Sequence, residues 1–158
     1  MYSYHLAQLN IAKMQYPIDS PEMQEFVDNL ERINALADQA PGFVWRLQTE
    51  EGDATSIDYF GGETIVNMSV WSDLSSLHTY VYRTGHAKIM SQRKQWFDRL
   101  MEAYMVLWWI PAGHLPDLDE ANERLVLLRR NGPSEAGFNF KHAFDPRGES
   151  VDIRKIVN

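Results

Sequence analysis

The sequence predicts an α+β fold of the ferredoxin-like type, a split β-α-β unit with one antiparallel sheet. Two observations predict it. Four separate stretches have the length and residue pattern of β-strands, and apolar residues recur at helical spacing after the first and the third of them. The resulting order, β-α-β-β-α-β with a C-terminal extension, defines this unit. A length of 158 residues fits a single domain with a real core.

The first strand and the first helix carry clear local signals. Residues 4–14 alternate, and Gln8 and Asn10 fall together on one face, where two amides in the middle of a strand are unusual. Ser20 and Pro21 begin a helix, as N-cap and first helical residue. That helix ends before Pro41, and its apolar stripe consists of Met23, Phe26, Val27, Leu30, Ile33 and Leu36.

The central part of the chain supplies two more strands and a broken helix. We predict strands over residues 43–50 and 65–71, with residues 56–60 extending a hairpin between them. A helix then begins at Ser72, is interrupted at Thr84-Gly85, and continues as a second segment from His86 to Met101.

The fourth strand, residues 104–110, is apolar on both faces and therefore needs cover on both sides. The two helices of a ferredoxin-like unit cover only one face of its sheet. We predict that a second copy of the chain covers the other face, giving a homodimer through the open sheet face. The alternative is cover within one chain, by a helix over residues 117–131 and a Phe-rich segment that follows it. We assign residues 1–144 to one domain that includes this helix, and residues 145–158 to a C-terminal tail.

Composition and charge exclude several classes of function. A net charge of −7 disfavours nucleic-acid binding, and no apolar run is long enough to span a membrane. The absence of cysteine excludes disulfides and thiolate chemistry and suits the reducing cytoplasm, where we expect the protein since the N-terminus does not resemble a signal peptide. The five histidines lack zinc-site spacing, so we expect no metal.

The second helical segment indicates a binding pocket. His86 and Arg93 share one helical face with three apolar residues, Ile89, Trp96 and Leu100, and that face should point toward the sheet. A buried Arg needs an anionic or amide partner, and strands one and three offer Asn10 and Asn67 opposite it. A gap with such walls would be apolar with a few directed polar groups, as ligand pockets are.

Each of these residues also has a purely structural interpretation. Arg93 could pair with Asp98 or Glu102, and His86 could bond backbone groups where its helical segment begins. Asn10 and Asn67 could tie neighbouring strands together. The Trp residues could be core or interface residues.

The motifs NMSVW, GHAKIMSQRKQWF and YMVLWWIPAGHLP resemble a bacterial family of unknown function in the dimeric α+β barrel superfamily, over roughly residues 4–144. This superfamily includes antibiotic-biosynthesis and haem-degrading monooxygenases. In haem-degrading members a strand-one Asn and a second-helix His serve the haem, at the positions of Asn10 and His86. Their helix Trp falls near Tyr80, so this sequence departs from that pattern.

The resemblance to cofactor-independent monooxygenases implies polar and aromatic residues around a phenolic substrate that itself reacts with oxygen. We therefore expect a monooxygenase-like enzyme acting on a small aromatic or polycyclic metabolite, with His86 and Asn10 as catalytic residues and no cofactor. The alternatives are a haem protein with His86 as axial ligand and a non-catalytic binder of a hydrophobic metabolite. The expected substrate-binding residues are Arg93, Tyr82, Asn67, Trp71, Trp96 and Trp108.

Overall fold

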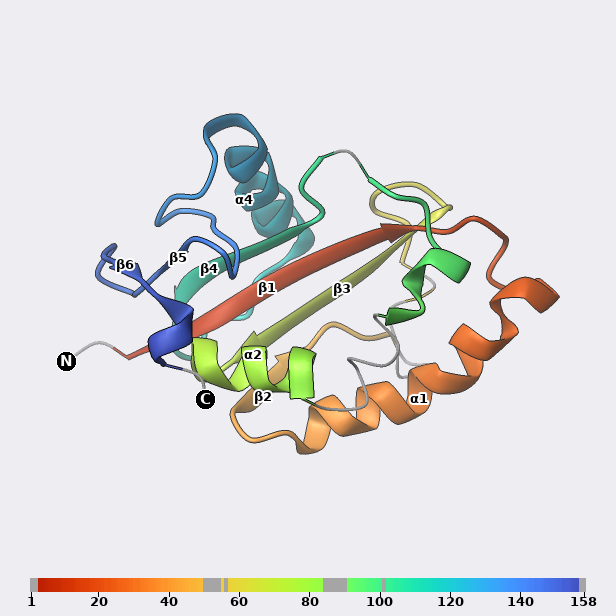
Figure 1. Ribbon diagram of the computed structural model, residues 1–158, viewed down its shortest axis with the longest axis horizontal. Coiled ribbons are helices and arrows are strands. Elements are labelled where there is room, and N and C mark those ends of the chain that lie inside the picture. The colour runs from red at the N-terminus through yellow and green to blue at the C-terminus, as the bar shows by residue number, and fades with distance from the viewer. Residues whose placement is uncertain (1–2, 50–54, 56, 84–90, 101, 157–158) are drawn as a thin grey trace.

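The computed structural model describes residues 3–49, 55, 57–83, 91–100 and 102–156. Its centre is a four-stranded antiparallel sheet with the strand order β2-β3-β1-β4 (Figure 1). The strands are β1 (Tyr4–Lys13), β2 (Phe43–Arg46), β3 (Thr64–Trp71) and β4 (Met105–Pro111). Together with the helices after β1 and β3, this order is that of the ferredoxin-like unit. The predicted fold class is confirmed.

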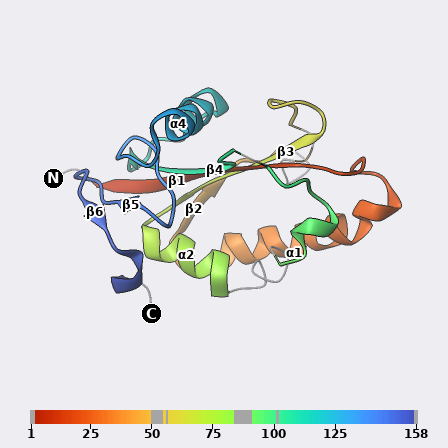
Figure 2. The ribbon, with the colours of Figure 1, turned by 45° about the horizontal axis from the view of Figure 1, so that its top comes forward.

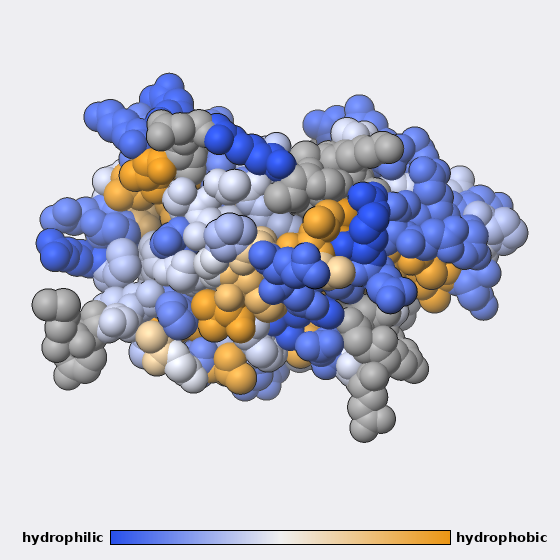
Figure 3. Space-filling model, turned by 90° about the horizontal axis from the view of Figure 1, so that it is seen from below, coloured by the Kyte–Doolittle hydropathy of each residue, from blue (hydrophilic) through white to orange (hydrophobic). Residues whose placement is uncertain are grey.

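Helices cover both faces of this sheet (Figure 2). On one face lie α1 (Gln24–Gln39), which a short 3-10 turn, Pro21–Met23, precedes, and α2 (Leu74–Arg83). On the other face lies α4 (Leu118–Asn131). No helix in the described part of the chain is long and apolar enough to cross a membrane. Seen from the side of α1 and α2, the molecule exposes apolar residues in small groups between hydrophilic ones (Figure 3).

The helix α4 supplies the cover that the fourth strand requires. Its buried residues Ala121, Leu125 and Leu128 belong to one apolar cluster with Val106 and Trp108 of β4. The Asp117 side chain accepts a hydrogen bond from the Glu120 amide at 2.8 Å, which caps the helix as the sequence predicts. The alternative of the sequence analysis, cover within one chain, therefore accounts for this face of β4. The homodimer through the sheet face stays a prediction, and the apolar faces of β4 no longer argue for it.

Three segments differ from the predicted elements. The second strand is predicted over residues 43–50, but β2 ends at Arg46 and residues 47–49 form no strand. Residues 57–60 form no strand, with a bend at Tyr59 and Phe60, and Ser56 of the predicted hairpin extension lies outside the described residues. The predicted helix His86–Met101 does not continue to its end, since Arg93–Gln95 is a 3-10 turn and Phe97 forms an isolated β-bridge with Met14. The physical reason is hydrogen bonding to the backbone at the end of β1. The backbone N–H of Gln15 donates to the Trp96 carbonyl at 2.8 Å, and the backbone N–H of Asp98 donates to the Lys13 carbonyl at 2.9 Å.

The C-terminal region packs against the free edge of β4. Phe138 exchanges two backbone hydrogen bonds with Leu107, at 2.8 and 2.9 Å. A small hairpin follows, formed by β5 (Ala143–Phe144) and β6 (Ser150–Val151), and then a 3-10 turn over Ile153–Lys155. Regular structure therefore continues past residue 144, where we placed the start of the tail.

Candidate functional site

A row of polar side chains lies on the sheet face that α1 and α2 cover. In the strand register Gln8 is opposite Ser69 and Asn10 is opposite Asn67, so the four side chains are neighbours on the two central strands. Gln8 and Ser69 are buried. A sheet face under helices is normally apolar, because polar groups there must be hydrogen-bonded or hydrated. This row is therefore the first candidate for a functional site.

The row is partly connected by hydrogen bonds. The Gln8 Nε2 donates to the Asn67 Oδ1 at 2.6 Å and to the Ser69 Oγ at 2.8 Å, and the Trp71 Nε1 donates to the same Ser69 Oγ at 2.8 Å. Ser69 thus accepts two hydrogen bonds, and its own hydroxyl hydrogen remains to be donated. The Asn67 side chain accepts through its oxygen, so its NH₂ group is also a remaining donor. The Asn10 side chain has no hydrogen-bond partner among the described residues.

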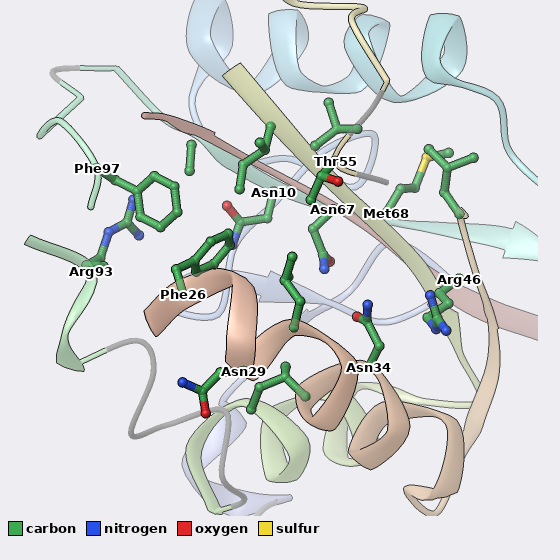
Figure 4. Close-up of a pocket in the computed structure, with 16 residues that line it drawn as sticks. Asn10, Phe26, Asn29, Asn34, Arg46, Thr55, Asn67, Met68, Arg93 and Phe97 are labelled. Atoms are coloured by element: carbon green, nitrogen blue, oxygen red, sulfur yellow. The ribbon is translucent and has the colours of Figure 1, made fainter. Parts of the chain in front are cut away.

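Two adjacent cavities open above this row, and Asn10 and Asn67 line both of them. The first has a volume of about 140 Å³ and lies between the sheet and α1. The second has a volume of about 290 Å³ and lies between the sheet, α2 and the segment around Phe140. Figure 4 shows the first cavity, with Asn10 and Asn67 reaching into it from the strands and Asn34 from α1.

Two arginines line the first cavity, at its opposite ends (Figure 4). Arg46 is paired with Asp38, with its Nε 2.8 Å from Oδ1 and an Nη 3.3 Å from Oδ2. The Arg93 guanidinium carbon lies 4.5 Å from the centroid of the Tyr104 ring. No carboxylate lines this cavity among the residues that the structure describes. The described lining therefore carries two arginines and no acid, and Asp38 neutralises one of the two.

The second cavity is uncharged in its described lining and rich in aromatic rings. Tyr80 is mostly buried and donates to the Ile33 carbonyl at 3.1 Å, and burial raises the pKa of this phenol far above its ordinary value. Tyr80 is thus a neutral wall residue and not a base. Tyr82 is 51% exposed, and its ring lies 5.8 Å from that of Phe140. The arrangement suits a flat apolar ligand with a few oxygen atoms.

The structure brings together four of the residues that the sequence analysis selected. Asn10 and Asn67 line both cavities, Arg93 lines the first and Tyr82 the second. His86 lies outside the described residues, and with it the predicted general base and the predicted axial ligand of a haem.

Three predicted substrate-binding tryptophans lie outside both linings. Trp71 and Trp96 are core residues. The ring centroid of Trp71 lies 5.0 Å from that of Tyr80, and the ring centroid of Trp96 lies 5.5 Å from that of Phe26. Trp108 is fully buried on the opposite side of the sheet, where its Nε1 donates to Glu120 at 2.8 Å. Its assignment to the same site as Asn10 is corrected, because odd and even residues of β4 face opposite sides of the sheet.

The structural alternative for Arg93, an ion pair with Asp98 or Glu102, is not what the described residues show. Glu102 lies 3.6 Å from Arg129, and Arg93 contacts the Tyr104 ring. For Asn67, which accepts a hydrogen bond from Gln8, a strand-tying role is part of the observed structure.

Sequence reasoning missed the contribution of α1. Asn29 and Asn34 line the first cavity, whereas the helix was interpreted only through its apolar stripe. A signal was present, since Asn34 lies four residues after Leu30 and directly after Ile33, at the margin of that stripe. Tyr104 and Asn139 of the second cavity were also missed.

The fold and the cavities define a ferredoxin-like α+β protein with a ligand-sized, polar-floored site between sheet and helices. The sequence matches the family described as "Domain of unknown function (DUF3291)" over residues 5–154, and the chain belongs to this family. No curated protein matches the sequence.

Several solved structures have a distantly similar fold. A protein of unknown function from Nitrosomonas europaea is 15% identical, with 74% of this chain and 99% of that chain covered and a TM-score of 0.45. SnoaB, a cofactor-independent oxygenase from Streptomyces nogalater, is 16% identical, with 73% and 100% covered and a TM-score of 0.45. A protein from Shewanella loihica described as a "putative monooxygenase" is 14% identical, with 74% and 98% covered and a TM-score of 0.33.

Proposed function

We propose that the protein binds a small aromatic or polycyclic metabolite across the two cavities and oxidises it in a monooxygenase-like reaction without a cofactor. The observation that carries this proposal is the polar row Gln8, Asn10, Asn67 and Ser69 beneath two connected sets of apolar and aromatic walls. Asn10 lines both cavities and has no side-chain partner among the described residues, so its amide is available to a ligand.

The chemistry follows from the donors of this row. A phenol or enol reacts with oxygen most readily once it is deprotonated, and the negative charge then develops on its oxygen atom. The Asn67 NH₂ and Ser69 hydroxyl groups can donate to that oxygen, because Gln8 and Trp71 occupy their acceptor atoms. In the simplest balanced reaction a CH₂ group and O₂ give a C=O group and one H₂O. The proposed general base is His86.

The test uses anthrone, whose CH₂ group is oxidised to the C=O of anthraquinone. We expect the wild-type protein to accelerate oxygen uptake and anthraquinone formation above the rate without protein. Removing one donor that stabilises a developing oxyanion costs about 100-fold in rate, so Asn67→Ala and Ser69→Ala should each approach the uncatalysed rate. Asn122→Ala, an amide of α4 on the other side of the sheet, is the matched control.

Binding without any oxygen uptake would leave a ligand-binding protein and refute the oxidation. Equal rates for the wild-type protein and both donor variants would refute the role of the polar row.

A further inference from the structure

We infer that the ligand carries an acidic group, most simply a carboxylate, which Arg93 holds, while its uncharged aromatic body occupies the second cavity. This inference rests on the binding part of the proposed function and specifies the class of ligand. Three observations carry it: the state of Arg93, its contrast with Arg46, and the place of Tyr104 between the cavities.

Arg93 is a half-buried cation that forms no ion pair with any residue that the structure describes. Its guanidinium lies over the Tyr104 ring, and no described carboxylate is within ion-pair distance of it. A cation–π contact uses the flat face of the guanidinium, so the N–H groups along its edge stay available for hydrogen bonds. That edge matches the two oxygens of a carboxylate. In a chain with a net charge of −7, an arginine that no described acid neutralises, in a cavity whose described lining holds no acid, is a specific feature.

Arg46 provides the internal comparison. It lines the same cavity, but Asp38 already binds its guanidinium through two hydrogen bonds. A ligand acid at Arg46 would compete with this carboxylate. The two arginines therefore differ in their readiness to accept an anion, although both contribute positive charge.

The position of Tyr104 fixes the direction in which the ligand extends. Arg93 lines the first cavity, the ring beneath it lines the second, and Asn10 and Asn67 line both. An acid held at Arg93 thus places the remainder of the ligand over the two amides and toward Tyr82 and Phe140. Because no charged side chain lines the second cavity in the described part, that remainder should be neutral.

The experiment compares 2-naphthoate with 2-naphthamide, which have nearly the same shape and differ in charge at pH 7.5. Calorimetric titrations give the Kd of each for the wild-type protein and for Arg93→Gln, Arg93→Lys and Arg46→Gln. We expect the wild-type protein to bind the naphthoate about tenfold or more tightly than the amide, as a charge-assisted hydrogen bond implies. Arg93→Gln should remove this preference. Its Kd for naphthamide should stay within about threefold of the wild-type value, which also shows that the variant is folded. Arg93→Lys should retain part of the preference, and Arg46→Gln most of it.

The outcomes separate the inference from the proposed function. Equal wild-type affinities for the two probes, or an unchanged preference in Arg93→Gln, would overturn the acid-binding role and leave the ligand site intact. Equal losses in Arg93→Gln and Arg46→Gln would overturn the assignment to Arg93. If neither probe binds the wild-type protein, the inference and the proposed ligand site are both refuted.

Discussion

Leu125→Ala tests whether α4 is the permanent cover of the sheet. The Leu125 side chain is fully buried in the cluster that joins α4 to β4 and β1, where Val106, Trp108 and Leu9 are also fully buried. The substitution removes three carbon atoms from this cluster. If α4 packs on the sheet as described, the neighbours cannot fill the space, because β1 and β4 are held in register by their ladder.

The expected loss follows from this burial. Leu→Ala substitutions at fully buried positions cost about 3 kcal/mol or somewhat more, as the transfer and cavity contributions add. For a chain of 158 residues, this loss lowers Tm by about 6–12 °C. The helix propensity of Ala is slightly better than that of Leu and does not change the sign.

The assay is urea unfolding followed by circular dichroism, with Leu115→Ala as the matched control. Leu115 lies just before α4 and is 53% exposed, so the same change should cost less than about 0.5 kcal/mol there. A loss below about 1 kcal/mol for Leu125→Ala would refute the packing of α4 and restore the argument for a second chain on this face.

Three further predictions concern the site and its surroundings. Gln8→Leu removes the donor that orients Asn67 and Ser69, and we expect a loss of about 1 kcal/mol in urea unfolding together with weaker naphthamide binding by calorimetry. Burial, with a smaller contribution from Arg83, lowers the pKa of His78, whose buried Nδ1 has no hydrogen-bond partner in the described part. The unfolded chain therefore binds a proton at His78 more readily than the folded chain does. The contribution of His78 to stability is complete above about pH 6.5 and is lost as the pH drops below it. His78→Phe should flatten this decline of the unfolding free energy between pH 7 and 5, and an unchanged slope of that free energy against pH would contradict the assignment. Gly42→Ala should cost more than about 1 kcal/mol in the same urea assay, because φ is +84° there and a Cβ would collide with the Ser76 side chain; a neutral result would refute this conformation.

The order of the elements could be predicted because each one carries a local signal. The alternation in residues 4–14 and the Ser20-Pro21 helix start depend only on neighbouring residues, and the structure has β1 and α1 close to these positions. The cover of β4 was a different problem. Its two apolar faces show that something must pack on each, but a helix of the same chain and a second chain bury the same surface. A symmetry argument favoured the second chain, whereas α4 was already present in the sequence.

The position of Arg93 was reached by an argument that the structure only partly supports. A continuous helix from His86 to Leu100 would direct Arg93 and Trp96 toward the sheet, yet the described part of this segment is a 3-10 turn followed by a β-bridge. The Gln15 side chain donates to the Lys94 carbonyl at 3.2 Å and to the Phe97 carbonyl at 2.8 Å. These bonds stabilise the non-helical backbone at residues 94–97. Such bonds join residues about 80 positions apart, and no local pattern reveals them.

The two amides in the middle of β1 are the sequence feature that leads most directly to the site. Hydrogen bonding within the row explains Gln8, which donates to Asn67 and Ser69 at once. It does not explain Asn10, which pairs in register with Asn67 and forms no side-chain hydrogen bond of its own among the described residues. Asn10 is half-buried, and its amide is open to the two cavities that meet there, so it can hydrogen-bond a ligand. An apolar residue at position 10 would keep the packing against α1 and lose those hydrogen bonds. Asn10→Leu should therefore stabilise the protein slightly or leave it unchanged while it weakens naphthamide binding, and a clear loss of stability with unchanged binding would assign Asn10 to the fold alone.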